Sequence, residues 1–197
     1  AVRAARAAGD LVRTAFAAPV VAEAKGSHDV VIATDRASEA LLAEILLGEG
    51  VPGDALLGEE GGTRGAATSA RRWIVDPIDG TVNFANGIPL FAVAIGLVVD
   101  SEPRIGVVYD PIRDELFAAS ASGPATLNGR ILHGGQKGLG DAVVALGLGG
   151  RRVVARTRAV RRAVRVTRSM GSSALSLAYV ANGRFDAFAQ ETGQSAW

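Results

Sequence analysis

The sequence contains no cysteine and only two histidines, and each shortage removes a class of chemistry. Without cysteine the chain can form neither disulfides nor thiolate metal sites, and nothing marks it for an oxidising compartment. His28 and His133 lie in segments expected to be loops, away from the motifs described below, so neither is expected to bind a metal. Serine-hydrolase chemistry is disfavoured because no Gly-x-Ser-x-Gly motif is present.

Long apolar runs and a strong excess of one charge are also missing. No run is long enough to cross a bilayer, and the first residues are too polar and interrupted for a signal peptide. The formal net charge is +1, so the field of the whole molecule favours neither nucleic acid nor acidic membranes. We therefore expect a cytoplasmic protein with a small-molecule partner, no membrane association and one substantial core.

Two aspartates lie close together in segment 73–84, the most informative stretch of the chain. Residues 72–75 predict a short buried strand. Because Pro77 cannot donate a hydrogen bond to a sheet, we expect this strand to end where Asp76 begins. Asp79 follows within the same turn, so both carboxylates can reach one divalent ion or a close pair of ions.

Gly80 and Thr81 directly follow the second aspartate and predict the start of a short helical turn. Glycine lets backbone N–H groups approach an anion, and the first N–H groups of a helix lack partners, so a phosphate would fit there. The same residues also suit an ordinary tight turn, because Asp, Pro and Gly are favoured in turns. Other motifs decide between these interpretations.

The remaining pattern predicts a mixed α/β protein in two halves. In the first half, residues 1–139, we expect helices over 2–18 and from Thr34 or Asp35 to 47, strands over 29–33, 91–99, 104–109 and 115–119, and a mobile polar loop over 61–70. Turns are expected at 110–114 and 123–129, with Asp110, Asp114 and Glu115 exposed. In the second half, residues 140–197, we expect strands over 142–146, 165–167 and 185–189 and helices over 151–164 and 172–181. The halves should pack as one unit with a cleft between them.

Several motifs, in a consistent order, carry a family resemblance. Asp76-Pro77-Ile78-Asp79-Gly80-Thr81 resembles the signature of the inositol monophosphatase family, within the lithium-sensitive, magnesium-dependent phosphatase superfamily. Leu57-Gly58-Glu59-Glu60-Gly61 resembles its first metal motif, and residues 25–35 resemble its Lys…Asp-x-Val-Thr-x-x-Asp segment. Gly171-Ser172-Ser173-Ala174 resembles its substrate-facing turn, and Glu191…Ala196-Trp197 resembles the start of its closing Trp-Asp motif.

The resemblance implies an α/β (α+β) fold, a layered αβαβα sandwich of the inositol monophosphatase and fructose-1,6-bisphosphatase type. The family's closing motif continues with an aspartate that binds metal, whereas this sequence stops at Trp197. The C-terminal portion of that fold is therefore expected to be missing from this chain. A polypeptide that truly ended there should lose a metal ligand and aggregate.

The resemblance also implies a set of site residues. The metal ligands would be Glu59, Asp76, Asp79 and the carbonyl of Ile78, holding two or three Mg²⁺ ions. Glu59 and Thr81 would position and deprotonate the attacking water, with Asp35 holding Thr81. Gly80 and Thr81 would bind phosphate, Gly171, Ser172, Ser173 and Glu191 would contact substrate, and Glu60 and Lys25 would support the site. Ser172 could instead simply cap a helix, Glu60 could cap its loop, and Lys25 could be solvated.

The leading functional hypothesis is a phosphoric monoester hydrolase that converts inositol monophosphate to inositol and phosphate, with the homodimeric state common in the family. Histidinol phosphate, fructose 1,6-bisphosphate and adenosine 3′,5′-bisphosphate are alternative substrates. A different class of function is a weakly catalytic scaffold that binds RNA or protein. Its only support is the arginine-rich segment 151–168, which is otherwise interpreted as a solvated face; nucleic acid is the weakest partner because no base-reading motif accompanies the charge.

Overall fold

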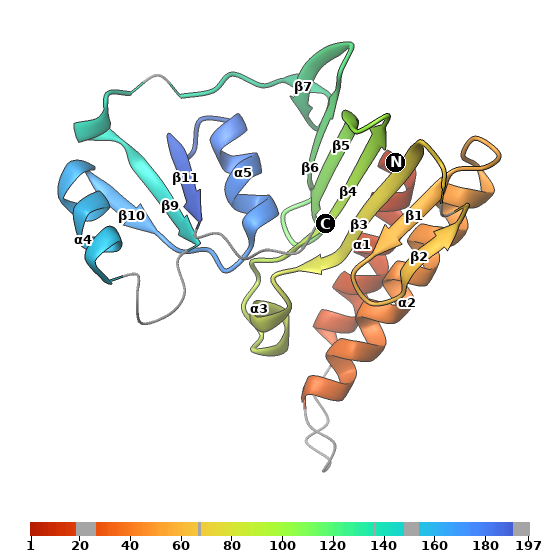
Figure 1. Ribbon diagram of the computed structural model, residues 1–197. Coiled ribbons are helices and arrows are strands. Elements are labelled where there is room, and N and C mark those ends of the chain that lie inside the picture. The colour runs from red at the N-terminus through yellow and green to blue at the C-terminus, as the bar shows by residue number, and fades with distance from the viewer. Residues whose placement is uncertain (19–26, 67, 136, 148–153, 191–197) are drawn as a thin grey trace.

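The computed structural model describes residues 1–18, 27–66, 68–135, 137–147 and 154–190, which form two β-sheets flanked by helices (Figure 1). The large sheet has the strand order β2-β1-β3-β4-β5-β6-β7-β8 and the small sheet the order β10-β9-β11. The strands of the large sheet are β1 (Ala55–Gly58), β2 (Gly62–Gly65), β3 (Arg71–Asp79), β4 (Ala92–Val99), β5 (Glu102–Asp110), β6 (Glu115–Ser120), β7 (Gly123–Leu127) and β8 (Arg130–Ile131). Those of the small sheet are β9 (Val143–Gly147), β10 (Val166–Arg168) and β11 (Ala187–Gln190).

The helices separate and cover these sheets. They are α1 (Val2–Ala17), α2 (Ser27–Gly48), α3 (Thr81–Ala85), η1 (Leu139–Asp141), α4 (Val154–Ala163) and α5 (Ser173–Ala181). Helices α1 and α2 cover one face of the large sheet, α5 lies between its other face and the small sheet, and α4 lies on the outer side of the small sheet (Figure 1). This order of layers confirms the predicted αβαβα sandwich. No helix in the described part of the chain is long and apolar enough to span a membrane.

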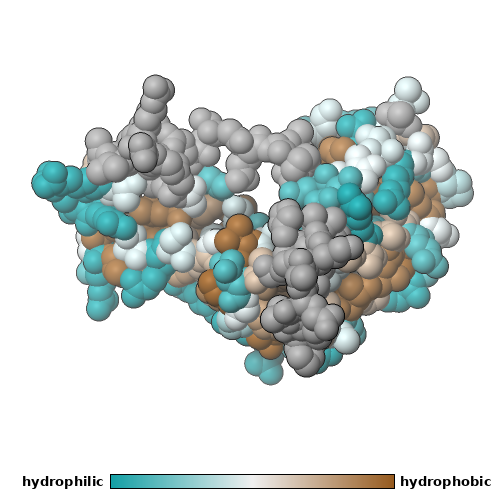
Figure 2. Space-filling view, turned by 90° about the horizontal axis from the view of Figure 1, so that it is seen from below, coloured by the Kyte–Doolittle hydropathy of each residue, from teal (hydrophilic) through white to brown (hydrophobic). Residues whose placement is uncertain are grey.

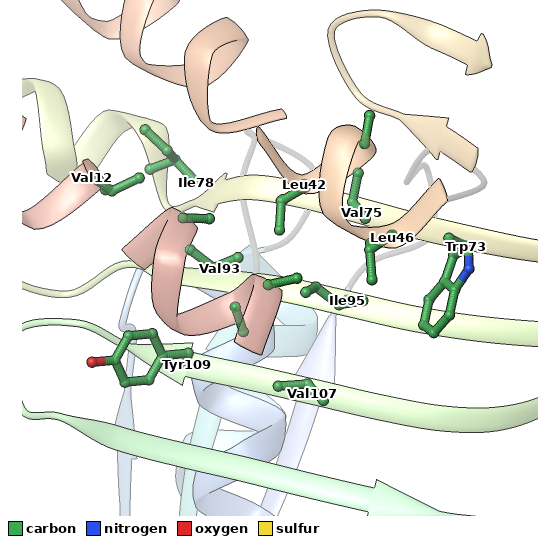
Figure 3. Packing of buried hydrophobic residues seen from close by; sticks show 14 of the residues in the cluster. Val12, Leu42, Leu46, Trp73, Val75, Ile78, Val93, Ile95, Val107 and Tyr109 are labelled. Carbon is green, nitrogen blue, oxygen red and sulfur yellow. The ribbon is translucent and has the colours of Figure 1, made fainter. Parts of the chain in front are cut away.

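The main core lies between the two N-terminal helices and the large sheet (Figure 3). Val12 and Leu42 from the helices pack with Val93 and other buried aliphatic side chains of the strands. Small residues let α1 approach closely, because a Cβ added at Gly9 would collide with the ring of Tyr109. Burying apolar surface in this way is the dominant stabilising contribution to such a layer.

The strand before the two aspartates does not stop at the proline. β3 extends from Arg71 to Asp79, and its pairing with β4 has an irregularity between Asp76 and Asp79. The prediction that the strand ends at Asp76 is therefore wrong, because a bulge accommodates a residue that lacks an N–H. The strand resumes after the irregularity and carries both carboxylates.

Other local expectations are corrected by tertiary packing. Residues 29–33 belong to helix α2, not to a strand. The loop expected over 61–70 contains β2, which pairs with β1, and the turn expected over 123–129 contains β7. Asp110 is fully buried, because its carboxylate accepts hydrogen bonds from the amides of Ile112 and Arg113 and forms an ion pair with the Arg113 side chain. The expected meander is confirmed by the antiparallel pairing of β4, β5 and β6.

Candidate active site

A parallel strand pair brings the first acidic motif beside the second. In this pair Gly58 of β1 lies opposite Val75 of β3. The next residues along the two strands are Glu59 and Asp76, so the register places their carboxylates side by side at one edge of the sheet. The two carboxyl groups are close enough for each to affect the pKa of the other. Sheet pairing therefore unites two motifs that are separated along the sequence.

The turn that follows Asp76 is stabilised by its own side chains. The Asp76 carboxylate accepts a hydrogen bond from the Ile78 amide at 3.1 Å, and the Thr81 hydroxyl donates to the Ile78 carbonyl at 3.1 Å. Gly80 has φ of 105°, and a Cβ there would lie 2.9 Å from the Leu90 carbonyl oxygen. Only glycine fits this conformation without strain, so the start of α3 is fixed close to the carboxylates. The predicted short helix after Asp79 is confirmed.

Asp79 faces the beginning of helix α5. Its carboxylate accepts hydrogen bonds from the Ser172 hydroxyl, from the Ser173 amide at 3.2 Å and from the Ala174 amide at 2.8 Å. Ser172 also caps α5 by accepting a hydrogen bond from the Leu175 amide. The capping interpretation of Ser172 is thus correct, and the same hydroxyl reaches the acidic motif.

Helix α2 adds two buried acids beneath these strands. Asp35 is 5% exposed, and Glu39, one turn further along, is fully buried. The Glu39 carboxylate accepts hydrogen bonds from the amides of Glu60 and Gly61 at 2.8 and 2.9 Å and therefore shapes the turn that carries Glu59. Glu39 was not expected from the sequence, where a glutamate within a helix usually indicates a solvated face.

Mutual repulsion in a partly buried site changes the protonation of these acids. Burial, followed by neighbouring glutamate charges, raises the pKa of Asp35 to about 7. Burial, followed by the charges of Asp79 and Glu59, raises the pKa of Asp76 to about 8. Burial is also the main cause that raises the pKa values of Glu59 and Asp79, although the hydrogen bonds from Ser172 and the α5 amides oppose the rise at Asp79.

The chemistry of this donor set fits a hard divalent cation. Within the described residues, no arginine or lysine forms an ion pair with Asp35, Glu59, Asp76 or Asp79. A bound cation would offset their repulsion and accept their oxygens as ligands. In the described part of the chain, no three aspartate, glutamate or histidine side chains lie close enough together to hold one metal ion. The Asp79 carboxylate is hydrogen bonded to the start of α5.

A polar cleft of about 390 Å³ connects this motif with the second half of the chain. It is lined on one side by Asp79, Gly80 and Thr81 and on the other by Gly171, Ser172 and Ser173. The structure therefore brings the predicted phosphate-binding and substrate-facing segments together. A second cavity, of about 450 Å³ between the large sheet and α5, reaches Asp76 but is otherwise lined by apolar side chains and glycines, which do not suit an anion.

Some predicted site residues remain untested by the geometry. Lys25 and Glu191 lie outside the described residues. The Thr81 hydroxyl donates to the Ile78 carbonyl. The hydrogen bonds of the described residues include none from Thr81 to Asp35, so the expected contact between these two residues stays a prediction. The Glu60 side chain is exposed. Gln190 also lines the cleft, next to Ser173, and no sequence signal distinguished it.

Comparisons with known proteins agree with this arrangement. The profile of the inositol monophosphatase family matches residues 1–197. The inositol-1-monophosphatase of Rhizobium meliloti is 43% identical over 180 residues, covering 88% of this chain and 67% of that protein. The Nus factor SuhB of Escherichia coli K12 is 36% identical over 206 residues, covering 100% of this chain and 76% of that protein.

A solved structure agrees with the fold. The inositol monophosphatase of Anabaena superposes with a TM-score of 0.86 at 33% identity, covering 98% of this chain and 74% of that one. The match to the family profile extends over the whole sequence and includes both acidic motifs and the turn at Gly171. The chain belongs to the inositol monophosphatase family.

Proposed function

We propose that this protein is a Mg²⁺-dependent phosphatase that hydrolyses inositol monophosphate to inositol and phosphate by means of metal-activated water. The observation that carries the proposal is that strand pairing places Glu59 beside Asp76, with Asp79 following on the same strand, while no arginine or lysine of the described residues forms an ion pair with these carboxylates. The adjoining polar cleft and membership of the family support the reaction class.

The metal ligands in this proposal are the carboxylates of Glu59, Asp76 and Asp79 and the carbonyl of Ile78. Two or three bound Mg²⁺ ions would acidify a water molecule and offset negative charge on the leaving oxygen. Asp76 belongs to the strand edge, whereas Asp79 also holds α5. Metal binding should therefore affect both halves of the chain.

Two acceptors are available to orient the attacking water. The Thr81 hydroxyl gives its hydrogen to the Ile78 carbonyl, so its oxygen is free to accept one hydrogen of a water molecule. The Glu59 carboxylate would accept the other proton as the nucleophile forms. This pair would direct the oxygen of the water towards the phosphorus, while Asp35 would support Thr81.

The substrate would lie across the cleft. The backbone N–H groups at Gly80 and Thr81 would bind the phosphate, and Gly171, Ser172, Ser173 and Glu191 would contact the hydroxyl-bearing leaving group. Lys25 and Glu60 would support the entrance. We further propose lithium sensitivity, a homodimer and a cytoplasmic location on the strength of the family resemblance, and two halves, 1–139 and 140–197, that act as one unit.

The test is Mg²⁺-dependent release of phosphate from inositol 1-phosphate, histidinol phosphate, fructose 1,6-bisphosphate and adenosine 3′,5′-bisphosphate. We expect inositol 1-phosphate to be the best substrate and EDTA to abolish its turnover. Preference for another compound would retain the metal chemistry and reassign the substrate pocket. Absence of turnover with all four would refute the enzymatic proposal.

A non-catalytic role is the second candidate, favoured by an exposed basic face and by the SuhB relative. Arg158, Arg161 and Arg162 of α4 and the following Arg165 are exposed, and hydrophilic residues lie at the rim of the end that carries α4, beside apolar ones (Figure 2). Reversing the charge at Arg158 and Arg162 should abolish binding of an anionic RNA or protein partner and leave phosphatase turnover unchanged. Equal loss of both activities would indicate misfolding.

A further inference from the structure

One buried amide side chain joins the acidic motif to the turn on the opposite side of the cleft. Asn83 lies in α3 and is 8% exposed. Its Nδ2 donates to the Leu90 carbonyl at 2.6 Å and to the Met170 carbonyl at 2.7 Å. The second contact links residues that are 87 positions apart in the sequence. Both hydrogens of the amide are therefore used. One bonds within the first half of the chain, residues 1–139 (the large half), and the other bonds across to the second half, residues 140–197 (the small half).

The turn is shaped to fit this side chain. Gly171 has φ of 71°, and a Cβ there would lie 2.7 Å from Nδ2 and 2.8 Å from Oδ1 of Asn83. A side chain at this position would be strained by its backbone conformation and would also collide with the amide. Gly171 and Asn83 therefore form a close-fitting pair, in addition to the hydrogen bond made by the adjacent Met170 carbonyl.

A second contact fixes the direction in which the turn points. Asp79, four positions before Asn83, accepts hydrogen bonds from Ser172, Ser173 and Ala174. The short segment 79–83 thus holds the turn at both ends, with Asn83 bound to its beginning and Asp79 bound to its end. Two separate attachment points restrict rotation as well as translation, which a single hydrogen bond cannot do.

We propose that Asn83 is a positioning residue that sets the substrate-facing turn of the small half at a fixed location relative to the carboxylates of the large sheet. The inference rests on the function proposed above. Asn83 is buried and both its N–H groups are used, so it acts through the turn and does not need to touch the substrate. Misplacing a binding group by about 1 Å can cost roughly 100-fold in rate.

The discriminating variant is Asn83→Asp, which keeps the size of the side chain and replaces the donor with an acceptor facing two carbonyl oxygens. Asn86→Asp is the matched control. Asn86 lies directly after the same short helix and is exposed, and its side chain donates to the nearby Val82 carbonyl at 2.7 Å. Gly171→Ala disturbs the same contact from the other side and serves if Asn83→Asp does not fold.

Two measurements separate positioning from a general structural role. The first is hydrogen exchange of the amides in 170–181, compared with those of β4 and β5. The second compares kcat and KM for inositol 1-phosphate with those for p-nitrophenyl phosphate, which lacks polyol hydroxyls for the turn to contact. We expect Asn83→Asp to increase exchange in 170–181 selectively and to lower kcat/KM for inositol 1-phosphate by about 10- to 100-fold more than for the aryl phosphate.

Uniformly faster exchange with equal losses on both substrates would overturn the proposal and assign Asn83 a purely structural role. Unchanged exchange and unchanged substrate preference would also overturn it. If the unaltered protein hydrolyses neither compound with Mg²⁺, the proposed function fails separately. The exchange comparison then decides alone: a selective increase supports the attachment of the turn by Asn83, and any other pattern refutes it.

Discussion

Replacing Asp76 by asparagine should stabilise the metal-free protein at pH 7 and remove most of its stabilisation by Mg²⁺. The pKa of Asp76 is raised from 3.8 to about 8 in the folded state, by burial first and then by neighbouring carboxylates. The folded protein therefore holds a proton that the unfolded chain releases between about pH 4 and 8. Stability is consequently lost as the pH rises through this window.

The size of the effect follows from the pKa shift. Each pH unit above 3.8 costs ~1.4 kcal/mol, which amounts to roughly 4 kcal/mol at pH 7 as an upper value. Asparagine keeps an oxygen that can accept the hydrogen bond from the Ile78 amide. Because a buried amide has its own desolvation cost, we expect a gain of about 1–3 kcal/mol in the free energy of unfolding.

Mg²⁺ should reverse the order of stability of the unaltered protein and Asp76→Asn. A cation at 100 times its dissociation constant stabilises a folded protein by about 2.7 kcal/mol, and this gain should be largely absent in Asp76→Asn. The assay is urea unfolding at pH 5, 7 and 8, with EDTA or with saturating Mg²⁺. The pH dependence of the unaltered protein should be steep in EDTA and flatter with Mg²⁺.

Asp110→Asn is the matched control, because Asp110 is fully buried, where Asp76 is half-buried, but has donors from two amides and Arg113. This variant should be less stable than the unaltered protein in EDTA and should keep its stabilisation by Mg²⁺. The reasoning is refuted if Asp76→Asn is destabilised at pH 7 in EDTA, or if Mg²⁺ stabilises it as strongly as the unaltered protein.

Three further predictions concern groups around the site. Gly80→Ala should lower the free energy of unfolding in urea by about 1–3 kcal/mol, because Gly80 has φ of 105° and a crowded Cβ position. The control Gly87→Ala, at φ of 69° with open space around the Cβ, should lose less stability. Equal losses in the two variants would contradict this prediction. Glu39→Gln should cost about 1–3 kcal/mol and weaken Mg²⁺ binding in calorimetry, because it removes an acceptor from the turn that carries Glu59, and unchanged affinity would count against that role. Phe84→Ala should cost about 3–5 kcal/mol in thermal or urea unfolding, since its ring packs with two other buried or half-buried phenylalanines, and a loss below 1 kcal/mol would show that this cluster is dispensable.

Local sequence was sufficient to predict the parts of the site whose chemistry depends on residues that are adjacent along the chain. The carboxylates of Asp76 and Asp79, the glycine between Asp79 and Thr81, and the short helix that follows are all encoded within one turn. Strand-like apolar segments separated by turn residues likewise predicted the meander of β4, β5 and β6. The order of the motifs predicted the family, which the comparisons confirm.

Tertiary structure decided what lies beside these motifs. A parallel register places Glu59 next to Asp76, a buried Glu39 shapes the turn between them, and a bulge lets β3 continue past Pro77. Helix propensity and apolar patterns describe neighbours along the chain, so they could not show that 29–33 is helical or that Asp110 is buried.

The sequence by itself determined which acidic and glycine residues this protein has available for metal and phosphate chemistry. Only the folded chain decided that Asp79 and Asn83 hold the turn at Gly171, because hydrogen bonds between segments about 90 residues apart depend on how the two sheets and α5 pack. Such contacts are set by burial and geometry in three dimensions, which no periodicity along the chain records.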